Sequence, residues 1–360
     1  MTAKFTSARA ELWRFPLATA MGGSGLTVVD VIVVDLESDD GARGTGFSYV
    51  LGGGGDAVHL LAGDMLQRLV RNQPVLPPQA LWRRLAASLN RLGRGAGYLA
   101  IAAIDVAAWD LAARRQGVPL YTALGGEARS MPVYGSAGFR PAQAPEEAAA
   151  RATEYAAMGC SAVKLRLSGS HRDVALLRAV SDVLPDGVHL MADANERCDL
   201  ARAKWLANRC ADVGGLWLEE PLPAYDAHGY AALAATSPIA IAAGEHLQGA
   251  GELTPFLKAG SLSVVQPDLS MMGGLTECLR TAGIAAHHGL VVAPHFLPAL
   301  FVHVAAAVPA MQWLEHFPLI EPLFNAPLEM DSDGKMMPPE TPGHGLEWAA
   351  GAREEYRIAG

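Results

Sequence analysis

Groups that ionise or bind metals follow short apolar segments in the second half of this 360-residue chain. The segments recur at intervals of roughly 20 to 30 residues, which is about the length of one strand–helix unit of a parallel barrel. The groups, in chain order, are Lys164, Arg166, Asp193, Glu219, Glu245, Asp268, His295 and Glu315. Because the carboxyl ends of barrel strands surround one mouth, we expect these side chains to meet around a single cavity.

Three carboxylates, Asp193, Glu219 and Glu245, end consecutive segments. They would repel one another strongly in one mouth unless a cation lay between them. Oxygen ligands without a thiolate or an imidazole suit Mg²⁺, so the sequence predicts one magnesium ion per subunit. Each carboxylate taken alone is equally well explained as a solvated charge at a strand end. Glu220 competes with Glu219, because alternation along a strand points one of the two inward.

An acid and an imidazole end the next two segments, at Asp268 and His295. A carboxylate beside an imidazole fixes its tautomer and raises its basicity, which suits a general base. The alternative is a histidine that is merely hydrogen-bonded in the core. We assign that role, or a surface position, to the remaining histidines of this region, which are His287, His288, His303 and His316.

Strand-like and helical segments alternate from about residue 126 onward. The strand-like segments are SAVKLRL, VHLMADAN, GLWLEEP, IAIAAGEH, LSVVQPD, LVVAPH and MQWLEH. This alternation with short loops is typical of a parallel sheet, and its repetition favours a barrel. The apolar stretch from Leu297 to Met311 is interrupted by two prolines and a histidine, which indicates a buried helix and no membrane span.

The first 125 residues have a different pattern. TVVDVIVVDLES and ARGTGFSYV alternate around the turn Asp39-Asp40-Gly41, which predicts a β-hairpin. GYLAIAAIDVAAWDLAARRQG has helical periodicity and ends at Gly117, with Pro119 just beyond. Strands followed by helices suggest a small α+β domain. Residues 321–360, rich in proline and glycine, are expected to pack back on that domain.

Composition restricts the possible partners. The formal net charge of −9 argues against nucleic acid and against an anionic membrane as partners. The four cysteines form no CxxC pair, and we expect reduced thiols in a cytoplasmic protein. The N-terminal residues MTAKFTSARAELWRF lack the apolar segment that a secretory signal carries.

The series of strand-end groups resembles the mandelate racemase group of the enolase superfamily. Members carry Lys-x-Lys on the second barrel strand, then Asp, Glu and Glu for magnesium, an Asp–His dyad and a final Glu. This chain offers Lys164-Leu165-Arg166 and the residues named above, with the flanking segments AAIDVAAWDLAARRQGVPLYTALGG, MADANE, WLEEP and QPDLSMMGGLTE. The resemblance implies an α/β fold, a modified (β/α)7β TIM-type barrel with an α+β capping domain. We therefore predict a capping domain at residues 1–125, the barrel at 126–320 and a tail at 321–360.

Loops of the capping domain close over the mouth in that family. The corresponding glycine-rich segments here are residues 20–25 and residues 51–55, where glycine permits hinge motion. A phosphate-binding loop is the alternative, but neither segment has a GxxxxGKS or GxGxxG pattern.

The resemblance also implies roles for individual residues. His295 would abstract the proton next to a substrate carboxylate, oriented by Asp268, while magnesium stabilises the enediolate. Lys164 would add positive potential near that carboxylate, and a protonated Glu315 would donate a hydrogen bond to the enediolate. Asn195, two residues beyond a metal ligand, would contact substrate hydroxyls or metal-bound water.

Arg166 departs from the family pattern, since racemases of this group use the second lysine as a base. Arginine stays protonated and makes a poor base, and it is alternatively an ion-pair partner of a metal-ligand carboxylate. One-base chemistry is therefore favoured, namely dehydration of an aldonic or aldaric acid to a 2-keto-3-deoxy acid. A racemase or epimerase of a 2-hydroxy or amino acid derivative, with Lys164 as second base, is the alternative.

Two further classes remain open at this point. A non-catalytic metal- or ligand-binding barrel is one, because a fold alone does not determine function. A metal-dependent hydrolase is disfavoured, because it would be expected to use histidine ligands. The partner is expected to be a small carboxylate, with a homo-oligomer, dimer or octamer, implied by the family. Substrate choice would depend on the lids and on residues 134–140, where Arg140 either holds a distal carboxylate or lies on the surface.

Overall fold

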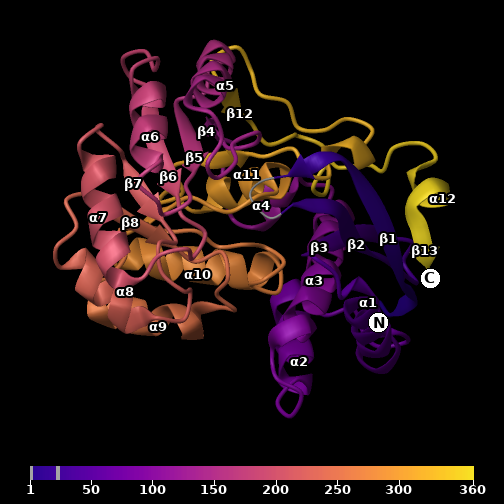
Figure 1. The fold of residues 1–360 in the computed structure, drawn as a ribbon. Helices are drawn as coiled ribbons and strands as arrows, with labels where there is room; N and C mark the ends of the chain where they lie inside the picture. The colour runs from indigo at the N-terminus through magenta and orange to yellow at the C-terminus, as the bar shows by residue number, and fades with distance from the viewer. Residues whose placement is uncertain (1–2, 22–24) are drawn as a thin grey trace.

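The computed structural model describes residues 3–21 and 25–360, which form a capping domain beside a barrel (Figure 1). The capping sheet consists of β1 (Phe5–Met21), β2 (Leu26–Ser38), β3 (Arg43–Leu51) and β13 (Arg357–Ala359), in the antiparallel order β13-β1-β2-β3. The predicted hairpin is confirmed as β2 and β3. Gly41 at its turn has a φ of 85°, a conformation that glycine adopts without strain.

Helices cover one face of the capping sheet. They are α1 (Gly55–Met65), the short π-helix η1 (Leu66–Val70), α2 (Pro78–Ser88) and α3 (Gly95–Gln116). The short helix α4 (Leu120–Ala123) packs instead between α3 and the barrel. The predicted long helix is confirmed as α3, which ends at Gly117 with a φ of 67°. This helix is long and apolar enough to cross a membrane, but 83% of its most apolar window is buried inside the protein, so it is a core helix.

Close packing of β3 on α3 depends on glycine. A Cβ atom added at Gly46 would lie 2.1 Å from the backbone nitrogen of Ala107, and one added at Gly44 would lie 2.4 Å from the Ala107 carbonyl oxygen. Both distances are far below van der Waals contact, so a larger residue would push the strand away from the helix. The glycines therefore fix the position of β3, whose far end reaches the barrel.

The barrel strands form a ring. They are β4 (Met131–Gly135), β5 (Ala162–Arg166), β6 (His189–Asp193), β7 (Trp217–Glu219), β8 (Ala240–Ala243), β9 (Val264–Val265), β10 (Val291–Val292) and β11 (Leu314–His316). The sheet order β10-β9-β8-β7-β6-β5-β4-β11 is parallel throughout, and a parallel bridge between Val292 and Met311 closes it. The strands β5 to β11 correspond to the seven segments expected from the sequence, β4 precedes them, and the modified (β/α)7β barrel is confirmed.

A helix follows each strand of the ring up to β10. These helices are α5 (Pro145–Ala157), α6 (Asp173–Ser181), α7 (Leu200–Ala211), α8 (Ala227–Ala234), α9 (Ala250–Ala259), α10 (Leu275–His287) and α11 (Pro298–Ala307). The apolar stretch near Leu297 is thus the buried helix α11, as predicted. Inside the ring, one side chain from each of seven consecutive strand segments builds a packed layer, namely Tyr134, Ala162, Met191, Trp217, Ala242, Val264 and Ala293.

The C-terminal segment contacts both domains. It contains η2 (Glu321–Leu323), β12 (Lys335–Met336) and α12 (Ala352–Tyr356) before β13. The strand β12 pairs with β4 of the barrel, whereas β13 pairs with β1 of the capping sheet. Trp348 packs on Trp13 with ring centroids 4.6 Å apart. The domain boundaries at residues 125 and 320 stay predictions.

Of the two expected lid segments, the structure describes residues 51–55 completely and residues 20–25 only in part. Of residues 20–25, the central three, 22–24, lie outside the described residues. In the second segment, Gly52, Gly53 and Gly54 have φ values of 77°, 106° and 98°, which other residues rarely adopt. That segment joins β3 to α1, and Leu51 at its start lines a cavity together with residues from the barrel strand ends.

Candidate active site

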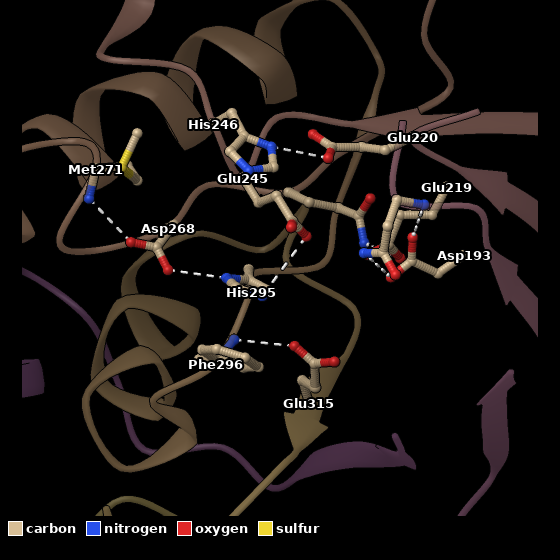
Figure 2. A network of polar contacts seen from close by, with 12 residues as sticks. Asp193, Glu219, Glu220, Glu245, His246, Asp268, Met271, His295, Phe296 and Glu315 are labelled. Atoms are coloured by element: carbon tan, nitrogen blue, oxygen red, sulfur yellow. Dashed lines mark hydrogen bonds and ion pairs between the residues drawn. The ribbon is translucent and has the colours of Figure 1, made fainter. Parts of the chain in front are cut away.

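Strand register places the expected groups in one layer at the carboxyl ends of the barrel strands. Arg166 pairs with Asp193 across β5 and β6, and Asp193 pairs with Glu219 across β6 and β7. Asp268 and His295 form a parallel bridge just beyond β9 and β10. Figure 2 shows the result, with His295 between Asp268 and Glu245 and the other acids beside it. The predicted convergence on one site is therefore observed.

The three acids Asp193, Glu219 and Glu245 lie together, with ligand atoms within 4.8 Å of one another. Glu219 is fully buried, and this burial, reinforced by the two neighbouring carboxylates, raises its pKa to about 8 although Lys164 opposes the shift. Glu245 Oε2 is buried without a hydrogen-bond partner among the described residues. An oxygen-only cluster with an unsatisfied carboxylate oxygen fits Mg²⁺ well.

The competition between Glu219 and Glu220 is resolved by the strand end. Glu219 points into the group of three, whereas Glu220 turns away, with a φ of 35°, and binds His246 Nδ1 at 2.8 Å (Figure 2). Together with Glu196, these two residues form a second ionisable group beside the first. Sequence alternation alone left the choice open because both glutamates lie at the turn that leaves β7.

Cationic and amide side chains hold two of the three acids, Glu219 and Asp193, in place. Lys164 Nζ donates to Glu219 Oε1 at 2.6 Å, and Gln266 Nε2 donates to Glu219 Oε2 at 2.6 Å. Arg166 Nη1 donates to Asp193 Oδ2 at 2.6 Å, which is the ion pair that the sequence offered as an alternative to base chemistry. Asn195 donates to Asp193 through its backbone and its side chain, at 2.8 and 3.0 Å.

The dyad has the geometry of an oriented base. His295 Nδ1 lies 2.9 Å from Asp268 Oδ2, and its other ring nitrogen, Nε2, lies 3.6 Å from Glu245 Oε2. The Phe296 ring stacks on the imidazole with centroids 3.7 Å apart. Burial alone would lower the pKa of His295, but Glu245 and the hydrogen bond that His295 donates to Asp268 outweigh it and raise the pKa to about 9. A cation held by the three acids would offset the charge of Glu245, which raises this pKa, and would thereby favour the neutral imidazole that can accept a proton.

Glu315 differs from the expected donor. Its Oε2 accepts a hydrogen bond from the Phe296 backbone N–H at 2.9 Å, and its Oε1 lies 3.0 Å from Lys164 Nζ. Burial would raise its pKa, but the charges of Lys164, His295 and Arg166 prevail and lower it to about 2. These surroundings favour the carboxylate, which corrects the expectation of a protonated Glu315 that donates to the substrate.

A cavity of about 460 Å³ opens above this layer. Arg166, Asn195, Glu245, Asp268 and His295 form its polar floor, while the capping domain contributes an apolar wall from Leu17, Leu26, Val50, Leu51 and Leu99. Within the described part of the chain, Lys164 and Glu219 lie beneath this floor with no exposed surface. A small molecule in the cavity would thus touch the base and Glu245 directly, and would sense Lys164 through its charge.

Several residues of the site were missed by sequence reasoning. Tyr49 and Ser270 contact the dyad loop, Gln266 holds Glu219, and His246 and Arg197 line the cavity. His246 and Gln266 lie close to the predicted strand ends at Glu245 and Asp268, so the same strand pattern could have indicated that they belong to the site. Tyr49 lies in a strand of the other domain, where alternation indicates only a core residue.

Some residues named from the sequence lie elsewhere. Arg140 is exposed and pairs with Glu147 at 2.8 Å on the surface, so it is the surface arginine and not a ligand of a distal carboxylate. His303 is buried in α11, and His287 and His288 are exposed at the end of α10, in agreement with their assignment outside the site.

Comparison with known proteins identifies the class first. The model of the family described as enolase C-terminal domain-like matches residues 147–352, and that of the mandelate racemase/muconate lactonizing enzyme N-terminal domain matches residues 2–125. The chain therefore belongs to the mandelate racemase/muconate lactonizing enzyme family of the enolase superfamily, as the resemblance of its motifs implied.

Individual proteins and solved structures are also similar to this chain over most of its length. An L-talarate/galactarate dehydratase of Salmonella typhimurium strain LT2 is 34% identical over 334 residues, which cover 91% of this chain and 83% of that protein. A 3,6-anhydro-alpha-L-galactonate cycloisomerase of Streptomyces coelicolor is 30% identical over 351 residues, which cover 94% of this chain and 95% of that protein. The crystal structure of L-talarate dehydratase from Polaromonas sp. JS666, complexed with Mg and L-glucarate, has a TM-score of 0.90 and 33% identity, covering 99% of this chain and 98% of that one.

Proposed function

We propose that this protein is a magnesium-dependent acid-sugar dehydratase, a hydro-lyase that converts an aldonic or aldaric acid to a 2-keto-3-deoxy acid. The observation that carries the proposal is the dyad of His295 and Asp268 facing three clustered carboxylates in one cavity. Its dehydratase relatives and the magnesium in a solved relative support the same chemistry.

His295 is the proposed base. Asp268 holds the imidazole through Nδ1, which leaves Nε2 for the proton next to the substrate carboxylate. Magnesium held by Asp193, Glu219 and Glu245 would supply positive charge that stabilises the enediolate left by proton removal. His295 then returns its proton to the β-hydroxyl, which departs as water, and the resulting enol tautomerises to the ketone.

The remaining residues set the charge of the site. Lys164 lies beneath the cavity floor with its ammonium between Glu219 and Glu315, so it adds positive potential without contacting the reacting atoms. Arg166 and Asn195 both hold Asp193 and both line the cavity, where they are placed to donate to oxygens of the substrate. Arg166 stays protonated, and its ion pair with Asp193 raises its pKa further although burial opposes this. Proton removal from the Arg166 side is therefore disfavoured.

The test is incubation with Mg²⁺ and a panel of aldonic and aldaric acids, followed by an assay for 2-keto acids. We expect at least one acid to yield a ketone, and His295→Asn to abolish this while calorimetry still detects Mg²⁺ binding. Deuterium exchange at the α carbon without any ketone would instead support the racemase or epimerase. Absence of Mg²⁺ binding would leave a ligand-binding barrel without catalysis.

We also propose a substrate class, an assembly and a cellular location for the enzyme. The substrate is a small carboxylate, in keeping with the L-glucarate bound by a solved relative. A homo-oligomer, dimer or octamer, in the cytoplasm is the arrangement we propose for the chain. Light scattering coupled to size-exclusion chromatography of the purified protein tests the oligomer, and a single 37.8 kDa species would contradict it.

A further inference from the structure

The capping domain makes a direct hydrogen bond to the catalytic dyad. Tyr49 lies near the end of β3, opposite Val31 of β2 in the capping sheet. Its hydroxyl donates to Asp268 Oδ2, the same oxygen that lies 2.9 Å from His295 Nδ1. Its backbone N–H donates to Ser270 Oγ at 3.0 Å. The hydroxyl and the backbone N–H of Tyr49 therefore both bind the loop that follows β9.

Asp268 is consequently held by three donors. The backbone N–H of Met271 binds Oδ1 at 2.9 Å, while Tyr49 and His295 share Oδ2 (Figure 2 shows the contacts of Asp268 with Met271 and His295). Only the contact with Met271 comes from the loop of Asp268 itself. Among the described residues, the imidazole alone would remain to fix the Oδ2 end of the carboxylate without the tyrosine hydroxyl.

Tyr49 is suited to be a permanent donor. It is 5% exposed, and its ring lies against Phe296, with centroids 5.8 Å apart. Burial, together with the charge of Asp268, raises the pKa of Tyr49 well above its usual value, so the hydroxyl keeps its proton. The ring is also positioned independently of its hydroxyl, because Phe296 packs against it and the β2–β3 ladder holds its backbone.

We propose that Tyr49 is a positioning residue of the reaction, which fixes Asp268 from the capping domain and thereby aims His295 at the substrate. The inference rests on the proposed function, since the reaction that it affects is proton removal by His295. Misalignment of the base lowers the rate of proton transfer. Substrate binding, which would involve the metal ligands and the cavity walls, is largely kept.

The test is Tyr49→Phe, which removes one oxygen and keeps the ring. We expect kcat to fall about 10-fold or more while KM changes by about twofold or less, the size of effect that loss of one hydrogen bond to a charged group produces. The primary isotope effect on kcat with substrate deuterated at the α carbon should increase, because proton removal becomes more rate-limiting. Tyr155→Phe is the matched control, since its hydroxyl donates to the Ala137 carbonyl at 3.0 Å on another part of the barrel.

A double-mutant cycle separates positioning from a general loss of structure. If Tyr49 acts through Asp268, then Tyr49→Phe should cause almost no further loss of kcat in an Asp268→Asn background. The same fold-loss in both backgrounds, or wild-type kcat and isotope effect in Tyr49→Phe, would overturn the inference. An inactive wild-type enzyme, with neither ketone formation nor α-proton exchange, would instead be a failure of the proposed function.

Discussion

Lys164 Nζ lies 2.6 Å from Glu219 Oε1, so the lysine of the family motif is ion-paired to one of the three carboxylates proposed to hold magnesium. Burial would lower the pKa of Lys164, but Glu219 and Glu315 reverse this and raise it well above its usual value. A lysine that keeps its proton at neutral pH supplies charge and cannot accept a proton. This contact therefore argues against Lys164 as the second base of a racemase.

Replacing Lys164 tests that distinction. We predict that Lys164→Ala lowers α-proton exchange in D2O by about 100-fold or more for the stereoisomer whose α proton faces His295, because a preorganised positive charge is lost. Proton NMR of the two stereoisomers measures the rates. Exchange of the opposite stereoisomer by the wild type that disappears in Lys164→Ala would show that Lys164 is a base after all. Lys258→Ala, at an exposed position on α9, serves as the control.

Binding of magnesium should release protons. The pKa of Glu219 is raised to about 8 by burial and by the neighbouring carboxylates, so at pH 7 without metal the group of Asp193, Glu219 and Glu245 holds close to one proton. Since a magnesium ligand must be ionised, we predict release of close to one proton per Mg²⁺ at pH 7, falling toward zero above about pH 9. Calorimetry in buffers of different ionisation enthalpy measures it, and Glu219→Gln should remove the release. An enthalpy independent of the buffer would refute the prediction.

The sequence was informative where function follows strand periodicity. Asp193, Glu219 and Glu245 were recognised because each ends an apolar segment, and a parallel barrel brings such ends together whatever the intervening helices do. Their cluster and the dyad were therefore predictable from spacing. The choice between Glu219 and Glu220 was not, because a left-handed residue at the strand end breaks the alternation on which the prediction relied.

Contacts between domains lay beyond the reach of such patterns. Tyr49 and Asp268 are 219 positions apart, and nothing in an alternating strand distinguishes a core tyrosine from one that touches a catalytic acid. The ionisation of Glu315 was also missed, since it depends on Lys164, His295 and Arg166 converging at distances that only the folded chain sets. The direction of a side chain on one strand can be predicted from the neighbouring residues, whereas the pKa of a buried carboxyl depends on charges from several distant strands.

Docking of the capping domain should depend on Asp105. This buried residue of α3 accepts hydrogen bonds from the backbone N–H and the hydroxyl of Thr276, at 2.8 and 2.7 Å, in the first turn of the barrel helix α10. It thus caps a helix of the other domain. We predict that Asp105→Ala lowers the free energy of unfolding by about 1–2 kcal/mol, measured by urea denaturation.

A matched change on the surface provides the control for that prediction. Asp64→Ala removes an exposed ion pair with Arg68 on the capping domain and should cost less than about 0.5 kcal/mol. Equal effects of the two substitutions would show that the cap on α10 contributes nothing to stability. Asp105→Asn, which keeps an oxygen acceptor, should lie between them.

Acid should destabilise the protein partly through His303. This residue is buried in α11, where burial lowers its pKa to about 3, and its Nε2 lies 3.2 Å from the His344 carbonyl. The imidazole of an unfolded chain has a pKa of about 6.5 and binds a proton below that pH. The buried imidazole of the folded protein binds a proton only near pH 3. The contribution of neutral His303 to stability is therefore present above about pH 6.5 and is lost as pH falls toward 3.

His303→Gln tests this linkage, because glutamine retains a donor for the His344 carbonyl and does not titrate. Urea denaturation between pH 7.5 and pH 4 should show that the wild type loses more stability than the variant, by on the order of a few kcal/mol. His287→Gln, at an exposed position on α10, should follow the wild-type curve. If the wild-type and His303→Gln curves run parallel over this range, the buried imidazole is not the group whose protonation drives acid unfolding.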